Sequence, residues 1–180
     1  QENGGGAIYS NNSVIRGENV TFDSNASGYY GGTIRVDYCE LILNNSKIIN
    51  SAGGTGGAIY ARGVSMTLTD VELTGNTSTL NGVLYLTGNR ATLTNVTATQ
   101  NTAAYGGVLY AASKSEVQIV NSRLNANNAK FGGALYISGN AAVTVRGGAL
   151  NENQATAGQG GAIYVAETAA EEVTNVTLKL

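Results

Sequence analysis

The sequence predicts an all-β protein, a single-stranded right-handed parallel β-helix (β-solenoid) of about seven turns, with 25–28 residues and three short strands per turn. Three observations predict this fold. A glycine pair returns at a nearly constant spacing, apolar residues alternate with other residues inside each unit, and asparagine recurs at two fixed places in the repeat.

The glycine pair opens each repeat and sets its length. The pairs begin at Gly5, Gly31, Gly56, Asn81 (with Gly82), Gly106, Gly132 and Gly160, so successive units are 26, 25, 25, 25, 26 and 28 residues apart. Such a period indicates a repeat protein without linkers, so we expect one domain over 1–180. Neither end offers the polar cap that solenoids normally require, so we expect this domain to be an excerpt of a longer rod. Glycine suits a corner because it accepts positive φ and leaves space where the wall is tight.

Within each unit, apolar residues recur with the period of two that is typical of a β-strand. The first strand supplies the column Ile8, Ile34, Ile59, Leu84, Leu109, Leu135 and Ile163. The second supplies pairs such as Leu41 and Leu43. The third supplies pairs such as Val20 and Phe22, and Val176 with Leu178 is assigned to it. Three strands in so few residues, with no helix between them, favour a solenoid whose turns stack about 4.8 Å apart. Its hand is expected to be right-handed.

Asparagine recurs at two corners of the repeat, and we expect both columns to form inward amide ladders. Asparagine tolerates left-handed backbone geometry, and its side chain can bond the backbone of the next turn. One column follows the third strand and contains Asn25, Ser51, Asn76, Asn101, Asn127 and Asn153. The other lies between the second and third strands and contains Asn19, Asn45, Asp70, Asn95, Asn121 and Asn175.

Tyrosine forms a third column, interrupted by Arg35, that the alternation places on the outer wall. Its members are Tyr9, Tyr60, Tyr85, Tyr110, Tyr136 and Tyr164. Two interpretations stay open. The rings form a stabilising aromatic ladder, or they form an exposed stripe that binds glycan or another rod.

Composition excludes several kinds of function. The chain has no histidine and no tryptophan, and Cys39 is its one cysteine, which excludes a histidine-based triad, a multi-cysteine zinc site and an internal disulfide. A net charge of −2 argues against binding nucleic acid. No apolar run approaches the roughly 18 residues of a membrane span, so we expect no direct membrane insertion in this segment. We expect no cofactor and no metal.

Two carboxylate pairs are the candidates for catalysis, because glycoside hydrolysis needs two carboxyl groups about 5–10 Å apart on one face. These are Asp37 with Glu40, and Asp70 with Glu72. Asp70 stands in an asparagine column, and Asp37 and Glu40 belong to the atypical stretch TIRVDYCEL. The sequence therefore predicts no catalytic residue.

Seven Asn-x-Ser/Thr sequons occur, at Asn11, Asn19, Asn25, Asn44, Asn76, Asn95 and Asn175. Five of them fall in the predicted ladders, where an inward amide cannot carry a sugar. Asn11 and Asn44 are therefore the expected glycosylation acceptors.

The repeat resembles that of the polymorphic outer-membrane proteins of chlamydiae. These carry a Gly-Gly-Ala-(Ile/Leu/Val) motif followed by Phe-x-x-Asn, and Gly5-Gly6-Ala7-Ile8 with Phe22-Asp23-Ser24-Asn25 matches both halves. Later units keep the glycines and replace the phenylalanine, as in LTGN at 73–76. Members of that family are surface-displayed autotransporter adhesins, so the resemblance implies a β-helical passenger at an extracellular or cell-surface location.

These observations together predict a non-catalytic structural or adhesive segment of a surface protein, either a rigid stalk or an adhesin passenger. Its expected partners are other protein chains or surface glycans, and not nucleic acid. The alternative is a self-assembling extracellular filament subunit that stacks end to end. A carbohydrate-active β-helix enzyme is the third interpretation.

Overall fold

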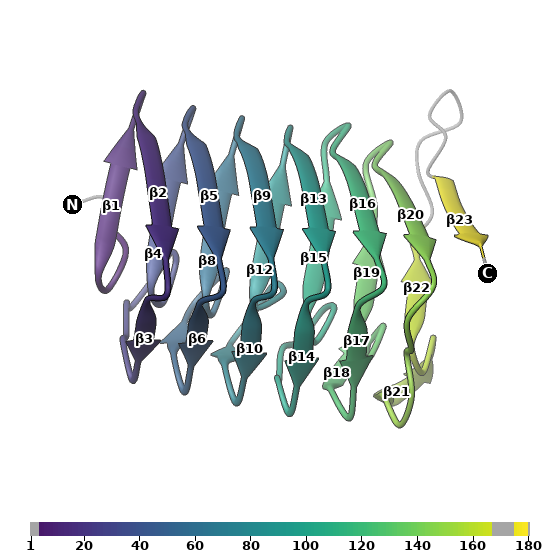
Figure 1. The fold of residues 1–180 in the computed structure, drawn as a ribbon. Coiled ribbons are helices and arrows are strands. Elements are labelled where there is room, and N and C mark those ends of the chain that lie inside the picture. Colours follow the sequence, from purple (N-terminus) through teal and green to yellow (C-terminus); the bar gives the residue numbers. More distant parts are fainter. Residues whose placement is uncertain (1–3, 167–174, 180) are drawn as a thin grey trace.

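The computed structural model describes residues 4–166 and 175–179, and this part of the chain is a rod of stacked, parallel β-strands with no helix (Figure 1). Each turn of the chain adds one strand to each of two long sheets, and most turns add one to a third. All paired strands are parallel, and equivalent strands of successive turns pair with one another. The predicted fold class, a parallel β-solenoid, is confirmed.

Three sheets run along the rod. The first sheet contains β1 (Ile8–Asn11), β4 (Ile34–Asp37), β8 (Ile59–Arg62), β12 (Leu84–Thr87), β15 (Leu109–Ala112), β19 (Leu135–Ile137) and β22 (Ile163–Val165). The second contains β2 (Val14–Glu18), β5 (Glu40–Asn44), β9 (Ser65–Thr69), β13 (Arg90–Thr94), β16 (Glu116–Val120), β20 (Ala142–Arg146) and β23 (Asn175–Lys179). The third contains β3 (Thr21–Asp23), β6 (Lys47–Ile49), β10 (Glu72–Thr74), β14 (Thr97–Thr99) and β17 (Arg123–Asn125).

Two short strand pairs add a partial fourth wall that the sequence did not predict. They are β7 (Ala52–Gly53) with β11 (Thr77–Ser78), and β18 (Asn128–Phe131) with β21 (Gln154–Gln159). This wall connects the third sheet of one turn to the glycine pair of the next.

The register of the first sheet matches the predicted apolar column. Leu84 pairs with Ile59 on one side and with Leu109 on the other, and all three side chains are completely buried. Because alternate residues of every strand face inward, the same columns line the whole interior and form one continuous apolar core.

The last strand lies in a different sheet from the one predicted. In β23, Val176 pairs with Val143 and Leu178 pairs with Val145, which places both residues in the second sheet and not in the third. Asn175 pairs with Ala142 at the start of that strand, so it is not a member of the corner column. The assignment failed because ten positions separate Val165 from Asn175, whereas five separate Ile137 from Ala142, and a period of two fits either strand.

Most corners are made by one residue with positive φ, and the residue after it faces inward; Gly147 and Gly148 both have positive φ. Between the second and third sheets the corner residues are Asn19, Asn45, Asp70, Asn95, Asn121 and Gly147, with φ between 44° and 62°. After the third sheet they are Ser24, Asn50, Gly75, Gln100, Ala126 and Glu152, with φ between 53° and 66°.

The first glycine of most pairs also has positive φ, for example 58° at Gly31. A Cβ atom at Gly31 would lie 2.2 Å from the carbonyl oxygen of Ile34, so no larger residue fits there. This confirms both reasons given for the recurring glycines.

Candidate functional site

Four asparagines at the corner after the third sheet form a buried amide ladder. The backbone amide of Asn76 donates to Oδ1 of Asn101 at 3.0 Å, and its Nδ2 donates to the same oxygen at 3.1 Å and to the carbonyl of Ile48 at 2.8 Å. Asn101 and Asn127 repeat this pattern up to Asn153. At the other end of the column, Asn25 is half-buried. The side chains of this ladder bond consecutive turns together and are closed to a ligand.

The second asparagine column lies on the surface, so the prediction that it forms an inward ladder was wrong. Its described members are exposed: Asn19, Asn45, Asp70, Asn95 and Asn121. Asn45 donates to Oδ1 of Asn19, and Asn95 donates to Oδ1 of Asp70 at 3.0 Å. The positive φ of the corner turns these side chains outward.

At this corner, the residue directly after each member of the asparagine column turns its side chain inward. There the hydroxyl of Ser46 accepts from the amide of Val20 at 3.1 Å, and that of Ser122 accepts from the amide of Val96 at 3.0 Å. A similar buried contact joins the first and second sheets, where Oδ1 of Asn89 accepts from the amide of Val64 at 2.8 Å. These inward residues were not predicted from the sequence. In the sequence, each of them directly follows an asparagine or glycine that makes the corner, and this spacing could have identified them.

The tyrosine column forms a stacked aromatic ladder on the outer face of the first sheet. Ring centroids are 5.1 Å apart between Tyr60 and Tyr85, 5.4 Å between Tyr85 and Tyr110, and 4.9 Å between Tyr110 and Tyr136. Tyr60 is only 9% exposed, and burial raises the pKa of Tyr60, Tyr85 and Tyr136. Because neighbouring rings occupy the faces of the inner rings, this geometry favours packing over ligand binding along the ladder.

A second aromatic row covers the first, and the sequence analysis missed it. Tyr30 lies 4.7 Å from Tyr60 between ring centroids, Tyr105 lies 5.2 Å from Tyr136 in an edge contact, and Phe131 lies 5.6 Å from Tyr164. The signal in the sequence was an aromatic residue immediately before a glycine pair, as in Tyr30-Gly31-Gly32.

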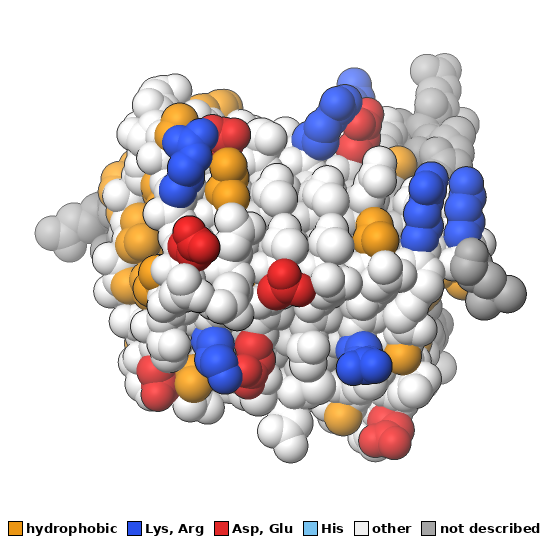
Figure 2. Space-filling view, viewed as in Figure 1, with side chains coloured by type: hydrophobic (Ala, Val, Ile, Leu, Met, Phe, Trp, Pro, Cys, Tyr) orange, Lys and Arg blue, Asp and Glu red, His pale blue; other side chains and the backbone are white. Residues whose placement is uncertain are grey.

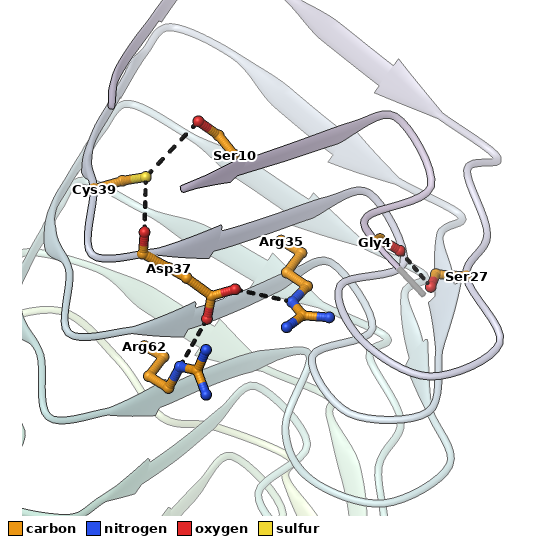
Figure 3. A network of polar contacts seen from close by, with 7 residues as sticks. All are labelled: Gly4, Ser10, Ser27, Arg35, Asp37, Cys39 and Arg62. Atoms are coloured by element: carbon orange, nitrogen blue, oxygen red, sulfur yellow. Dashed lines mark hydrogen bonds and ion pairs between the residues drawn. The ribbon is translucent and has the colours of Figure 1, made fainter. Parts of the chain in front are cut away.

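Arg35 takes the place of a tyrosine in the ladder and holds a buried ion network (Figure 3). Its guanidinium carbon lies 5.1 Å from the ring centroid of Tyr9 and 5.7 Å from that of Tyr60, so it continues the stack through cation–π contacts. Nε of Arg35 lies 3.1 Å from Asp37 Oδ2, and Nε of Arg62 lies 2.8 Å from Asp37 Oδ1. Asp37 is completely buried, so these two arginines neutralise its charge where water cannot.

Cys39 lies beside this network. Its thiol donates to the backbone carbonyl of Asp37 at 3.2 Å, and the side chain is buried. Its sulfur also lies 3.8 Å from the hydroxyl oxygen of Ser10 (Figure 3), so Cys39 packs as a small apolar residue with weak hydrogen bonds.

The other candidate carboxylates are also paired within the chain. Glu40 lies 2.9 Å from Nη2 of Arg16, and Glu72 lies 2.8 Å from Nζ of Lys47. The hydrogen bond from Lys47 lowers the pKa of Glu72. Asp37 is completely buried against its arginines while Glu40 is at the surface, so these two carboxylates do not share one exposed face. Over the described residues, no group of three or more Cys, Asp or Glu side chains is placed to hold a metal ion.

Exposed aromatic residues gather in the first two turns of the rod. Tyr9, Tyr29, Tyr30 and Tyr38 are 50%, 61%, 38% and 58% exposed, and Figure 2 shows hydrophobic side chains gathered at this end of the visible face. A shallow trough crosses the neighbouring corner of the first three turns. This corner trough is lined by Ala26, Ser27, Gly28, Ala52, Gly53, Gly54, Thr77 and Thr79.

Some sequon asparagines are exposed on the surface of the rod, and others are buried or half-buried. Asn11 and Asn44, the expected acceptors, are exposed, and so are Asn19 and Asn95, which had been assigned to a ladder. Asn76 is completely buried, and Asn25 is half-buried. The side chain of Asn175 lies outside the described part of the structure.

Residues 4–178 match a family model described as a right handed beta helix region. No curated protein and no solved structure matches the chain. Over its described residues, the chain forms no helix of the length and hydropathy that a membrane crossing requires.

Proposed function

Because this chain belongs to the right-handed β-helix family, we propose that it is a non-catalytic rod segment of an extracellular surface protein, acting as a stalk or adhesin passenger. The resemblance of its Gly-Gly-Ala-Ile and Phe-x-x-Asn motifs to those of chlamydial surface adhesins supports the extracellular assignment. The family contains enzymes as well as non-enzymes, so the absence of catalysis is argued from the side chains of this chain.

The pairing of the candidate carboxylates is the observation that carries the proposal. Asp37 pairs with Arg35 and Arg62, Glu40 pairs with Arg16, Glu72 pairs with Lys47, and Asp70 accepts from Asn95. A general acid needs a raised pKa, and the pKa of Glu72 is lowered instead. The polar groups of the rod therefore support its own structure.

The adhesive part of the proposal is supported by the exposed aromatic residues of the first turns. Exposed tyrosine side chains combine a large apolar area with a hydroxyl, which suits contact with a glycan or a protein. Tyr29 and Tyr38 offer such surface outside the stacked ladder.

The proposal is tested with beads that carry the purified rod. Wild-type beads are expected to adhere to glycan-bearing cell surfaces, and the rod is expected to release no reducing sugar or unsaturated product from polysaccharides. A Glu40→Gln/Asp70→Asn/Glu72→Gln variant removes three candidate carboxylates and is expected to adhere equally. Polysaccharide cleavage by the wild-type rod that is lost in this variant would overturn the non-catalytic assignment.

An end-stacking filament subunit is the second candidate. Val165 and Leu178 continue the inward columns of the first and second sheets, yet they are 45% and 64% exposed. Leu178 also lines an apolar depression with Val145 and Leu150. A second copy stacked on this face would cover these side chains and continue the parallel sheets.

A further inference from the structure

Two sequons stand at equivalent positions of the repeat and have the same sequence. Asn19-Val20-Thr21 and Asn95-Val96-Thr97 both run from the corner between the second and third sheets into the third sheet. Asn19 and Asn95 each have a φ of 55°, and both side chains are exposed. This corner is on the near side of the rod in Figure 1, where β2 turns into β3 and β13 turns into β14. The two asparagines therefore face solvent at the same corner of different turns.

The side-chain amides of these two asparagines are free to exchange a proton for a sugar. Among the described residues, Nδ2 of Asn95 donates to Oδ1 of Asp70 alone, at 3.0 Å. Asn19 contributes its Oδ1, which accepts from Asn45. An asparagine amide has two protons, and a sugar replaces one of them. Both contacts therefore survive the modification.

Asn76 shows the opposite arrangement in a sequon of its own, Asn76-Thr77-Ser78. It is completely buried, and its Nδ2 donates to the carbonyl of Ile48 at 2.8 Å and to Oδ1 of Asn101 at 3.1 Å. Both amide protons are used inside the rod, so a sugar on Asn76 is incompatible with the folded ladder. The fold therefore separates the sequons by the bonding of their amides as well as by exposure.

The hydroxyl that completes the sequon is also exposed at the two corner sites. An Asn-x-Ser/Thr acceptor requires this hydroxyl. Thr21 and Thr97 are the first residues of β3 and β14, and both are exposed. At Asn44, by contrast, the hydroxyl belongs to Ser46, which is 1% exposed and donates to the carbonyl of Asn44 at 2.7 Å. The folded chain therefore presents both polar ends of the acceptor at the corner sites and only one of them at Asn44.

We propose that Asn19 and Asn95 are N-glycosylation sites whose donor is a lipid-linked oligosaccharide. Nδ2 of each asparagine forms a bond to C1 of the first sugar, and the bond from C1 to the pyrophosphate oxygen breaks. The lipid pyrophosphate leaves with the electron pair of that bond, and the amide gives up one proton. The inference rests on the proposed extracellular location, because this modification belongs to the surfaces of secreted chains. The sugars are bulky and cover the corner between the second and third sheets.

Secretion of the intact chain from mammalian cells, directed by an added signal peptide, tests the proposal. Treatment of the secreted rod with peptide:N-glycosidase in heavy-oxygen water converts each glycosylated asparagine to a labelled aspartate, which peptide mass spectrometry locates. We expect label at Asn19 and Asn95. None is expected at Asn76, because a chain with a sugar there cannot close its ladder and is not secreted. A secreted rod without label at Asn19 and Asn95, or with Asn76 labelled as strongly, would overturn the proposal.

Three single variants locate the sugars. Thr21→Ala and Thr97→Ala each remove an exposed hydroxyl and keep the corner asparagine, so each is expected to lose one label and the mass of one oligosaccharide. Arg123→Thr is the converse change. Asn121 is exposed in the same column with a φ of 50°, and this variant completes a sequon there. Arg123 pairs with Thr97 of the adjacent turn, so threonine fits its position. We expect one additional label, at Asn121, and its absence would contradict the corner geometry as the basis of the sites.

Adhesion of beads that carry the same secreted protein separates this inference from the proposed function. A rod that adheres without sugar at either corner site would overturn the glycosylation and leave the adhesive function standing. A rod that carries both sugars and does not adhere would overturn the adhesive function and support the glycosylation. Failure in both measurements would overturn both.

Discussion

Oδ1 of Asn127 accepts two hydrogen bonds from Asn101, one from its backbone amide and one from its Nδ2, both at 3.0 Å. One amide oxygen therefore satisfies a backbone donor and a side-chain donor of the adjacent turn. Because Asn76 and Asn101 share the same arrangement, the corner is held by a chain of identical contacts along the rod axis.

Removing one member of this ladder should be costly. Asn76→Ala deprives the amide of Ser51 and the carbonyl of Ile48 of their buried partners. We expect the free energy of unfolding to fall by about 1–3 kcal/mol, measured by urea denaturation. Asn95→Gly is the control, because Asn95 is exposed and glycine keeps its positive φ. A loss at Asn95 as large as that at Asn76 would contradict the inside–outside assignment.

The buried ion network predicts a second pattern of stability. Asp37→Ala removes a completely buried ion-pair partner from Arg35, whose site is 3% exposed, and we expect a loss of about 3–5 kcal/mol. Arg62→Ala should cost less than Asp37→Ala, because the Arg62 side chain is 44% exposed and Asp37 keeps its contact with Arg35.

A double variant provides the compensating control for this network. Arg35→Tyr/Asp37→Thr copies the residues that stand in the same columns at Tyr85 and Thr87. We expect its stability to equal or exceed that of the wild type, since replacing a buried ion pair by packed side chains is often neutral or stabilising. A double variant as unstable as Asp37→Ala would show that the network is required by the local backbone.

The aromatic ladder predicts alkaline sensitivity. Burial raises the pKa of Tyr60, Tyr85 and Tyr136 above the ordinary tyrosine value of about 10. Their stabilising contribution is therefore complete below about pH 10 and is lost as the pH rises through the raised values, because the unfolded chain ionises first. A Tyr85→Phe/Tyr136→Phe variant should lose less unfolding free energy than the wild type between about pH 9.5 and 11. Parallel losses in the two proteins would count against buried phenols.

The exposed core columns at the last described turn predict self-association. Leu178→Lys places a charge where parallel stacking would bury a leucine, so we expect it to weaken association more than Tyr164→Lys on the outer wall. Sedimentation velocity across a concentration series measures this difference. Equal weakening by both changes would point to lateral contact through the tyrosines, and a monomer at all concentrations would remove the basis for the filament candidate.

Periodicity was enough to predict the fold, because identical turns must stack with identical columns in register. The glycine spacing and the alternation around residues such as Leu84 predicted the strands, the inward columns and the parallel pairing. Periodicity did not predict whether the side chain of a corner asparagine faces inward or outward. Asn76 and Asn95 are both corner asparagines in the sequence, but one follows a residue with positive φ and faces inward, while the other has the positive φ and faces outward.

The candidate surface was less accessible to sequence reasoning than the fold. The tyrosine column was visible in the sequence. The recurrence of Tyr30, Tyr105 and Phe131 before glycine pairs was visible too, but it does not show that their rings pack over the tyrosine column. The trough exists because small residues such as Ala26 and Ala52 follow one another in successive turns and leave the surface hollow there. The last strand was misassigned because an extra stretch before Asn175 breaks the period.

Pairing restricted to neighbouring turns has a mechanical consequence. Leu84 pairs with Ile59 and Leu109, each 25 positions away, and no strand of the described residues bridges more distant turns. Tension applied along the axis therefore peels the outermost coil without disturbing those behind it. Each released coil of 25 residues would extend to about 85 Å, since an extended residue spans roughly 3.3–3.6 Å. Stretched between two surfaces, such a rod would lengthen in equal steps and absorb a sudden pull while most of its coils stay folded.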